Sequence, residues 1–300
     1  MAGAFTQVDL SQLAAPDVVE ALDFETIKAE MLADLLARDT AFSALVESDT
    51  GYKIIEVCAY RELLIRQRVN NAVKAVMLAY ATGADLDQIA ANYNVGRLLI
   101  TPADGSAVPP TAAVYEGDTD LRARIPLSLE GYTSAGSTGS YEFHALSASG
   151  DVKDASAVSP DPGQVVVYVL SRVGDGTAST ETIDAVTAAL NAEKVRPITD
   201  QVSVLSASIV NYTIEAELVV FAGPDAGVLL ELAQTAAQDY ADAQHRMGLD
   251  ITLSGVYAAL HQAGIQRVNL AEPSANIVIS DGEAPYCTSI SITVAASTDA

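Results

Sequence analysis

The chain has 300 residues, of which 50% are apolar, and a formal net charge of −23. This length allows two or three domains, each with a core of its own. The acidity argues against a nucleic-acid-binding protein, which needs a basic stripe to neutralise phosphates, and against docking on anionic lipid. The two cysteines, Cys58 and Cys287, have no metal-ligand spacing, and we expect buried free thiols in a reducing compartment.

Residues 1–22 are predicted to form an extended arm, of the kind that becomes ordered on a partner. Pro16 blocks an early helix, and the apolar anchors are Leu10, Leu13 and Val18. No basic region followed by an apolar core precedes Pro16, so no signal peptide is expected. No uncharged apolar run approaches the length of a membrane span, and we expect folding in a cytoplasm.

Residues 23–97 are predicted to form a helical segment. A first helix covers about residues 23–39, where apolar side chains recur at helical spacing behind Asp23 and Glu25. These apolar positions are Phe24, Ile27, Met31 and Leu35.

A second, longer helix is predicted between Tyr52 and Ala81, because roughly 30 residues there contain neither Gly nor Pro. One stripe recurs at three- and four-residue steps and is apolar except for Arg66: Ile55, Ala59, Leu63, Arg66, Val69, Val73, Met77 and Tyr80. Gly83 is expected to end this helix, and Asp85 to cap a short third helix. The expected inner face of that third helix is Leu86, Ile89, Ala90 and Tyr93.

The stretch of residues 51–97 has an unusual charge. It holds six basic and four acidic side chains, about +2 by simple count, in a chain that is −23 overall. Two interpretations stay open: the basic residues form the solvated face of an amphipathic helix, or an Arg-bearing helix docks on an acidic surface of another copy or partner. Under the second, R66E with R68E is expected to block assembly and leave the monomer folded.

Residues 98–150 are predicted to form a linker, or a short strand pair, followed by short helices. Asp118 and Asp120 precede an apolar run, where acidic side chains favour a helix N-terminus. An EF-type calcium loop is not expected, because Leu121 and Leu127 stand where that loop needs Gly and Glu.

A run of small residues occupies positions 131–140. It lacks the Gly-Lys-Ser/Thr ending of a phosphate-binding P-loop, and no strong strand precedes it. We interpret it as a flexible loop that leads into a helix at residues 141–148.

From residue 151 the pattern alternates between strands and helices. Residues 151–206 are predicted to form a β-β-α-β unit, with a helix capped by Ser179 or Thr180. Its strands are expected at residues 152–159, 164–170 and 201–205.

Residues 207–300 are predicted to form a second α+β unit. Its strands are expected at residues 209–221, 265–270 and 289–294. Its helices are expected at residues 225–247 and 254–261, the second capped by Ser254 and ended by Gly264.

The predicted fold class is therefore α+β: a long-helix region followed by successive small α+β domains, each a sheet with helices on one face. The predicted domains are an arm (1–22), a helical segment (23–97), a linker with short helices (98–150) and two α+β domains (151–206 and 207–300).

The chemistry of the chain is sparse. Its histidines are His144, His245 and His261, and none belongs to a His-x-x-x-His or His-Glu-x-x-His pattern, so zinc is not expected. No Gly-x-Ser-x-Gly nucleophile elbow occurs. We expect ordinary surface or capping histidines, and no catalytic, metal or cofactor site.

Several segments together resemble one known family. They are residues 59–70 (AYRELLIRQRVN), 84–90 (ADLDQIA), 120–126 (DLRARIP), 174–177 (GDGT), 196–197 (RP), 257–261 (YAALH) and 264–268 (GIQRV). Their order and spacing are similar to those of the baseplate J-like family of contractile-tailed phages. The resemblance covers nearly the whole chain.

The resemblance implies a structural virion protein without catalytic residues. Family members form wedges of a tail baseplate, where copies pair alongside a smaller wedge partner and six wedges close into a ring around the hub and spike. The implied location is the tail baseplate, after assembly in the host cytoplasm, next to sheath-proximal tail proteins. The helical segment would then pack in a bundle within the wedge, with these candidate contact residues: Tyr60, Arg61, Leu64, Arg66, Arg68, Asn70 and Asp85.

Two alternatives stay open. A hydrolase would bring Asp118, Asp120 and His144 into one pocket. A receptor- or carbohydrate-binding tail module would favour exposed aromatic residues, although the chain has no Trp.

Overall fold

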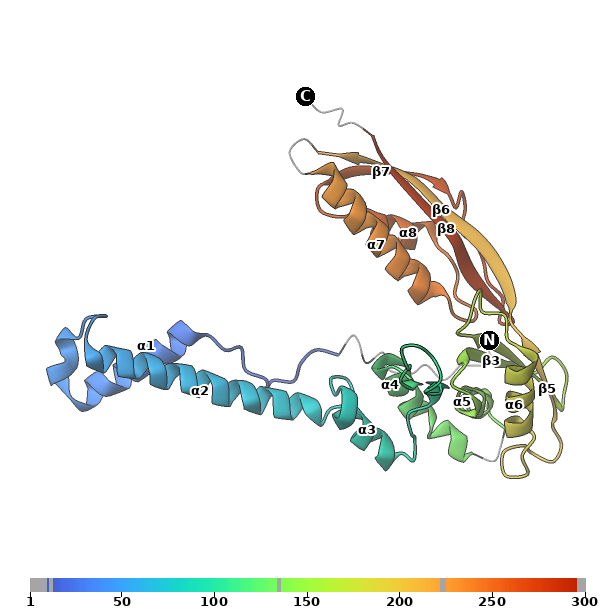
Figure 1. Ribbon diagram of the computed structural model, residues 1–300, viewed down its shortest axis with the longest axis horizontal. Coiled ribbons are helices and arrows are strands. Elements are labelled where there is room, and N and C mark those ends of the chain that lie inside the picture. Colours follow the sequence, from blue (N-terminus) through green and yellow to red (C-terminus); the bar gives the residue numbers. More distant parts are fainter. Residues whose placement is uncertain (1–9, 11–12, 134–135, 222–224, 296–300) are drawn as a thin grey trace. The chain divides into compact units, whose positions relative to one another are not determined.

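The structure, a computed structural model, describes residue 10 and residues 13–133, 136–221 and 225–295 (Figure 1). The chain divides into two compact units. The helical unit contains the described residues up to Gly96 together with Asp118–Arg122, and the α+β unit contains Arg97–Gly117 and the described residues from Ala123 onward. Long helices come first and small sheets follow, which confirms the predicted α+β class.

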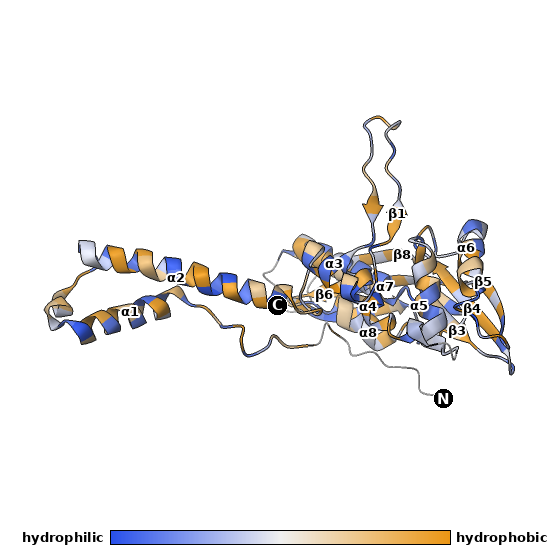
Figure 2. Cartoon of the chain, turned by 90° about the horizontal axis from the view of Figure 1, so that it is seen from below, coloured by the Kyte–Doolittle hydropathy of each residue, from blue (hydrophilic) through white to orange (hydrophobic). Residues whose placement is uncertain are grey.

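Two helices lie side by side in the helical unit and form a hairpin (Figures 1 and 2). The elements of this unit are α1 (Phe24–Arg38), a 3-10 helix (Thr40–Ala44), α2 (Thr50–Ala75) and α3 (Gly83–Asn92). Asp23 caps α1, because its carboxylate accepts a hydrogen bond from the Thr26 N–H at 2.8 Å. The buried apolar side chains of α1 and α2 are Ile27 and Ala59.

The end of α2 differs from the prediction. The helix stops at Ala75, although Gly and Pro are absent as far as Ala81. The Arg122 guanidinium explains the difference, because it donates hydrogen bonds to the carbonyl oxygens of Leu78 and Ala81. Those carbonyls are thereby satisfied without a continuing helix.

The start of α3 also differs. Gly83 has a φ of +53° but is the first residue of α3, and Thr82 occupies the N-cap position predicted for Asp85. The capping acceptor comes from elsewhere: the Asp118 carboxylate accepts a hydrogen bond from the Gly83 N–H at 3.0 Å. Two buried side chains confirm the predicted inner face of α3, Leu86 and Ala90.

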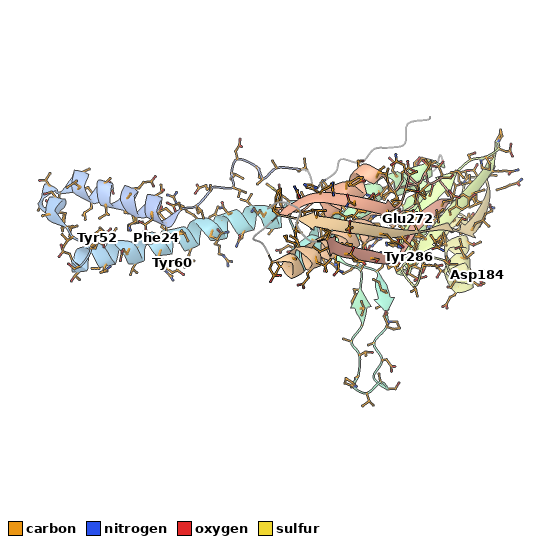
Figure 3. All side chains as sticks on the ribbon, turned by 90° about the horizontal axis from the view of Figure 1, so that it is seen from above. Phe24, Tyr52, Tyr60, Asp184, Glu272 and Tyr286 are labelled. Carbon is orange, nitrogen blue, oxygen red and sulfur yellow. The ribbon has the colours of Figure 1, made fainter. Side chains whose placement is uncertain are left out.

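A two-stranded ribbon begins the α+β unit and confirms the predicted strand pair. It consists of β1 (Leu99–Thr101) and β2 (Val114–Tyr115), and Figures 2 and 3 show it leaving the rest of its unit. Helix α4 (Asp118–Leu127) follows, with Asp118 and Asp120 in its first turn as predicted. A 3-10 helix (Glu130–Tyr132) comes next.

A buried ion pair holds the base of this ribbon. The Arg124 guanidinium donates to both carboxylate oxygens of Glu116, at 3.0 and 2.7 Å, and to the Ser147 hydroxyl at 3.1 Å. Glu116 and Arg124 are only 3% and 4% exposed. Glu116 also accepts a hydrogen bond from the Leu98 N–H at 3.1 Å, so one carboxylate joins the ribbon to α4.

The first three-stranded sheet, with its helices, has the predicted β-β-α-β topology. Its elements are α5 (Thr138–Ala148), β3 (Val152–Val158), β4 (Gln164–Ser171), α6 (Thr180–Leu190) and β5 (Gln201–Ser206). The strand order is β3-β4-β5, antiparallel and then parallel. Ser179 caps α6 as predicted, because its hydroxyl accepts from the Thr182 N–H at 3.1 Å. Helix α5 begins three residues before its predicted start at residue 141.

The second sheet has order β7-β6-β8, with two helices on one face (Figure 1). Its elements are β6 (Ser208–Val220), α7 (Ala226–Gln244), α8 (Leu253–Leu260), β7 (Ile265–Glu272) and β8 (Glu283–Ala295). Thr252 caps α8 in place of the predicted Ser254, since its hydroxyl accepts from the Gly255 N–H at 3.2 Å. Of the strands in this sheet, β8 differs most from its predicted range of 289–294. It includes Pro285 and begins six residues before residue 289. Pro is tolerated there because β8 is an edge strand.

The two sheets meet without a linker. Ala207 is the single residue between β5 and β6, and it is buried with Leu170 and Ala284 in a small apolar cluster. The Asp154 carboxylate, on β3, accepts a hydrogen bond from the Met247 N–H at 3.0 Å. Among the described helices, none combines the length and apolar character that a bilayer span requires.

Candidate assembly surface on the helical hairpin

Helix α2 has two apolar faces. One faces α1 and includes the buried Ala59 and the half-buried Ile55 and Leu63. Between the two helices, the Lys28 ammonium lies 5.4 Å from the ring centre of Phe24 and 5.7 Å from that of Tyr52, and Figure 3 labels both rings. This face follows the predicted helical spacing, except that Val69, which was expected in the same stripe, is 52% exposed on the second face.

The second face of α2 is uncovered in the described structure. Its large apolar side chains are between 40% and 65% exposed: Ile54, Val57, Tyr60, Leu64, Ile65 and Val69. Val76, the C-cap residue of α2, is 75% exposed. Figure 2 shows apolar residues recurring along the whole of α2. A helix that is apolar on two sides needs a covering element on each, and α1 supplies only one. An exposed apolar row of this length is typical of a protein–protein contact.

The expected contact residues fall into three groups: five exposed side chains, the ion-paired Arg66 and the buried Asn70. Tyr60, Arg61, Leu64 and Arg68 are exposed on α2, and Asp85 is exposed on α3. Leu64, Arg68 and Asp85 also line one open groove of about 440 Å³ between α2 and α3. The structure therefore brings these three predicted residues together.

Arg66 is engaged within its own chain. Its guanidinium donates to the Glu62 carboxylate, with Nε 2.9 Å from Oε1, and lies 3.5 Å from the Glu20 carboxylate. These carboxylates, Glu62 first, raise the pKa of Arg66 above its ordinary value. Arg66 thus links α2 to the arm, and its neighbour Arg68 is the more accessible charge.

Asn70 is buried and also binds the arm. Its amide oxygen accepts a hydrogen bond from the Glu20 N–H at 3.1 Å, and its amide nitrogen donates to the Glu20 carbonyl at 2.9 Å. A second anchor is the Tyr80 hydroxyl, which donates to the Leu13 carbonyl. The described part of the arm therefore lies along α2, held by polar groups. Leu10 is half-buried, and the predicted apolar anchors Leu13 and Val18 are exposed.

Sequence reasoning missed the apolar residues of the second face, such as Ile54, Val57 and Ile65. The available signal was their own three- and four-residue spacing, offset from the first stripe. Cys58 lies among them and is exposed, which corrects the expectation of a buried thiol. The thiol was expected inside because Cys is usually buried, but its position on α2 falls outside the side covered by α1.

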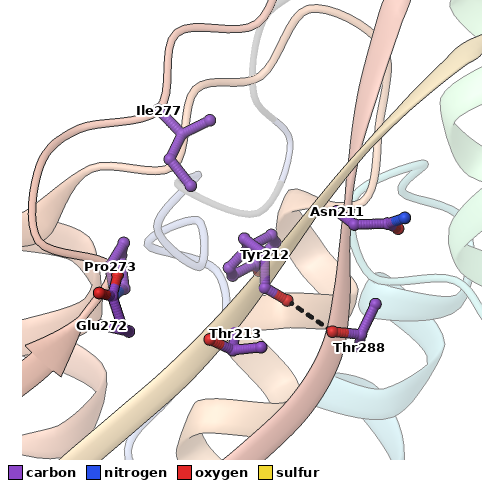
Figure 4. A pocket seen from close by; sticks show the side chains of 7 residues that line it. All are labelled: Asn211, Tyr212, Thr213, Glu272, Pro273, Ile277 and Thr288. Carbon is purple, nitrogen blue, oxygen red and sulfur yellow. Dashed lines mark hydrogen bonds between the residues drawn. The ribbon is translucent and has the colours of Figure 1, made fainter.

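The α+β unit contains a shallow polar pocket of about 420 Å³ (Figure 4). Its lining residues are Asn211, Tyr212, Thr213, Glu272, Pro273, Ile277 and Thr288. One hydrogen bond crosses it, from the Thr288 hydroxyl to the Tyr212 carbonyl at 3.1 Å. Glu272 has no basic residue beside it in this lining, and a nucleophile–base pair is absent from it.

The residues considered for catalysis have structural contacts. Asp118 caps α3. His245 and His261 occupy the C-cap positions of α7 and α8, where their backbone N–H groups donate to the carbonyl oxygens of Ala241 and Tyr257. Burial lowers the pKa of both His144 and His245. Within the described ranges, no group of His, Cys, Asp and Glu side chains is arranged to hold a metal ion.

Comparison with known proteins identifies the class. Three successive families match the chain: the baseplate J-like N-terminal domain at residues 47–104, the central domain at residues 133–206 and the C-terminal domain at residues 212–293. The chain therefore belongs to the baseplate J-like family, and its role is that of a structural component of a phage-tail baseplate.

One relative is similar over almost its full length. Baseplate protein J of Escherichia phage P2 is 50% identical over 288 residues, which cover 94% of this chain and 95% of the relative. Among solved structures, a chain of the six-fold symmetrised cryo-EM structure of the anti-feeding prophage baseplate aligns with a TM-score of 0.42 and 12% identity. That alignment covers 59% of this chain and 43% of the other.

Proposed function

We propose that this protein is a wedge component of a contractile-tail baseplate and acts by assembly, not by catalysis. In this proposal, the segment 23–97 forms the core helical bundle of the wedge together with a second copy and a smaller wedge partner. Six wedges then close into a ring around the hub and spike and contact sheath-proximal tail proteins. Assembly takes place in the host cytoplasm, without nucleic acid or membrane as a partner.

The observation that carries the proposal is the uncovered apolar face of α2. Six large apolar side chains on that helix are exposed, whereas the only buried apolar residue of α1 is Ile27. Full burial of one such side chain contributes about 1.5–3 kcal/mol, so covering this row by partner helices would strongly favour association. Tyr60 and Leu64 lie in the row, and Arg61 and Arg68 would supply its charged contacts.

A mass measurement on the purified chain tests the proposal, alone and co-expressed with the neighbouring tail proteins. We expect a discrete hetero-complex that contains a smaller tail protein. Ile65→Glu should abolish that complex, because Ile65 is 65% exposed in the row and a buried carboxylate there would be unpaired. Arg68→Glu should weaken it with little change in monomer stability.

Ala188→Glu is the matched control, since Ala188 is an exposed helical residue on α6 in the other unit and the charge change is the same. It should leave the complex intact. A stable wild-type chain that remains indifferent to every tail protein would refute the wedge proposal. It would also reopen the case for a receptor-binding module.

A further inference from the structure

The outer edge of β8 is a second candidate interaction surface. β8 pairs along one side with β6, and in the order β7-β6-β8 no described strand pairs with its other side. Its 13 residues contain one charged side chain, Glu283, at the very start. A long, uncharged edge offers unpaired N–H and C=O groups to any extended strand.

The other edges of the two three-stranded sheets are protected against pairing with a further strand. β7 carries Arg267 and Glu272 in eight residues, and Pro273 follows it. In the first sheet, β3 carries Lys153 and Asp154, and β5 has only six residues. Charge, proline and short length are the ordinary means of preventing edge pairing. On β8, Pro285 blunts the beginning and the extra residue Thr288 shifts the pairing register, whereas residues 289–295 have no such protection.

The side chains of β8 suit cross-strand pairing. Ser289, Ser291 and Thr293 are exposed on the solvated face of the sheet, and Ser and Thr pair well across antiparallel strands. On the opposite face, Ile290 and Val294 are only partly buried against the core, so a further strand would extend that core.

The helix next to β8 is α7. It packs over β8, and its Tyr240 hydroxyl lies 3.3 Å from the Thr252 nitrogen at the start of α8. Helical geometry places Leu230, Gln234 and Gln238 on the opposite flank, above the outer edge of β8. All three are uncharged, and Gln238 donates a hydrogen bond to the Asp242 carboxylate at 2.9 Å, so an acidic group on this flank is bound within its own helix.

We propose that two copies of this chain pair antiparallel through their β8 edges and form one continuous six-stranded sheet. The pairing rests on the proposed structural function and adds to it a surface outside the helical hairpin. A second copy is the fitting occupant because a two-fold pair presents the same edge twice and is self-complementary. In a chain of net charge −23, β8 itself has no charged residue after Glu283, so the strands of two copies can pair without bringing like charges on the strands together.

The test places charge on the edge without changing the core. Ser291→Lys with Thr293→Lys adds two exposed lysines to β8, and two copies would then bring four lysines together. Asn269→Lys is the control, on the opposite edge of the same sheet, where the new ammonium faces Glu217. Circular dichroism and thermal melting establish that each variant is folded, and sedimentation over a range of concentrations gives the dimer dissociation constant.

For the wild type and Asn269→Lys we expect a dimer, with hydrogen exchange at residues 286–295 that slows as concentration rises. For the double variant we expect the dissociation constant to rise at least about tenfold. A wild type that stays monomeric, or a double variant that pairs like the wild type, overturns the proposal. If Ile65→Glu abolishes the dimer and β8 exchange never depends on concentration, pairing runs through the hairpin and only the β8 proposal fails.

Discussion

Asn70 and Glu20 are joined by two hydrogen bonds, in which the Asn70 amide satisfies both the N–H and the carbonyl of the Glu20 backbone. The contact spans 50 residues of sequence. It fixes the arm on the side of α2 that faces α1 and leaves the second apolar face of α2 uncovered. The position of the arm therefore decides which part of the hairpin is available to a partner.

Asn70→Ala should release the arm from α2. Loss of the amide leaves two backbone groups without their partner at a part-buried site, which costs about 1–3 kcal/mol. Hydrogen exchange at residues 16–22 should become faster, and the urea midpoint should fall. Asn71→Ala, an exposed neighbour on α2, should change neither quantity. Equal exchange in both variants would contradict the anchoring role.

Glu116→Gln should destabilise the α+β unit severely. It removes the carboxylate that receives two hydrogen bonds from the buried Arg124, and a buried charge without its counter-ion costs about 3–5 kcal/mol. Glu56→Gln breaks an exposed pair with Lys53 and should cost no more than about 1 kcal/mol. Urea unfolding of both variants checks the difference.

A double replacement sharpens this prediction. Glu116→Leu with Arg124→Met removes both charges together, and such apolar replacements of buried pairs are often neutral or stabilising. We expect the double variant to be more stable than Glu116→Gln. A double variant that is less stable than the single one would mean that the remaining hydrogen bonds of Arg124 matter more than its charge.

Gly176→Ala should strain the contact between the two sheets. A Cβ on Gly176 would lie 2.8 Å from Nε2 of His245 and closer still to the Leu170 side chain. Gly174 also has a positive φ, +67° against +99° at Gly176, but its Cβ would meet nothing within 4 Å. Gly176→Ala should therefore lower the free energy of unfolding by about 1–3 kcal/mol more than Gly174→Ala. Equal melting temperatures of the two variants would show that the Leu170 and His245 side chains move aside without loss of stability.

His245 should make stability depend on pH. Burial lowers its pKa below the ordinary value of 6.5, and Nε2 has no hydrogen-bond partner among the described residues. The unfolded chain then binds a proton at higher pH than the folded chain. The contribution of His245 to the free energy of unfolding must fall as pH falls through about 6.5.

The measurement is the difference in unfolding free energy between the wild type and His245→Gln at several pH values. Burial raises the pKa of Glu142 and Asp154, and these carboxylates act in the opposite direction. They are present in both proteins and largely cancel in the difference. A difference that stays constant between about pH 7 and pH 5 would contradict the assignment.

Local signals predicted most of the fold. Asp23 and Ser179 are helix caps whose acceptor and donor lie three residues apart, so the sequence displays them directly. The β-β-α-β order was likewise visible from strand periodicity. The errors occur where a distant group decides the outcome: Arg122 binds the carbonyls after α2, and Asp118 replaces Asp85 as the cap of α3.

The candidate surface was predicted only in part. Tyr60, Leu64 and Arg68 were named and are exposed, but Asn70 and Arg66 contact the arm instead. Their partner, Glu20, lies about 50 residues away, and no local pattern reveals such a pairing. The length of β8 was missed for another reason, since Pro285 argues against a strand unless the strand is known to be at an edge.

The junction at Ala207 has a mechanical consequence. From Gln201 to Val220 the chain is held to one sheet or the other, because Ala207 donates to the Val169 carbonyl and Ser208 to the Gly282 carbonyl. A tensile load applied along β6 therefore reaches β5 without first straightening a slack linker. It is resisted by rows of sheet hydrogen bonds loaded in shear. Within this unit, a displacement imposed on one sheet is passed to the other with little loss.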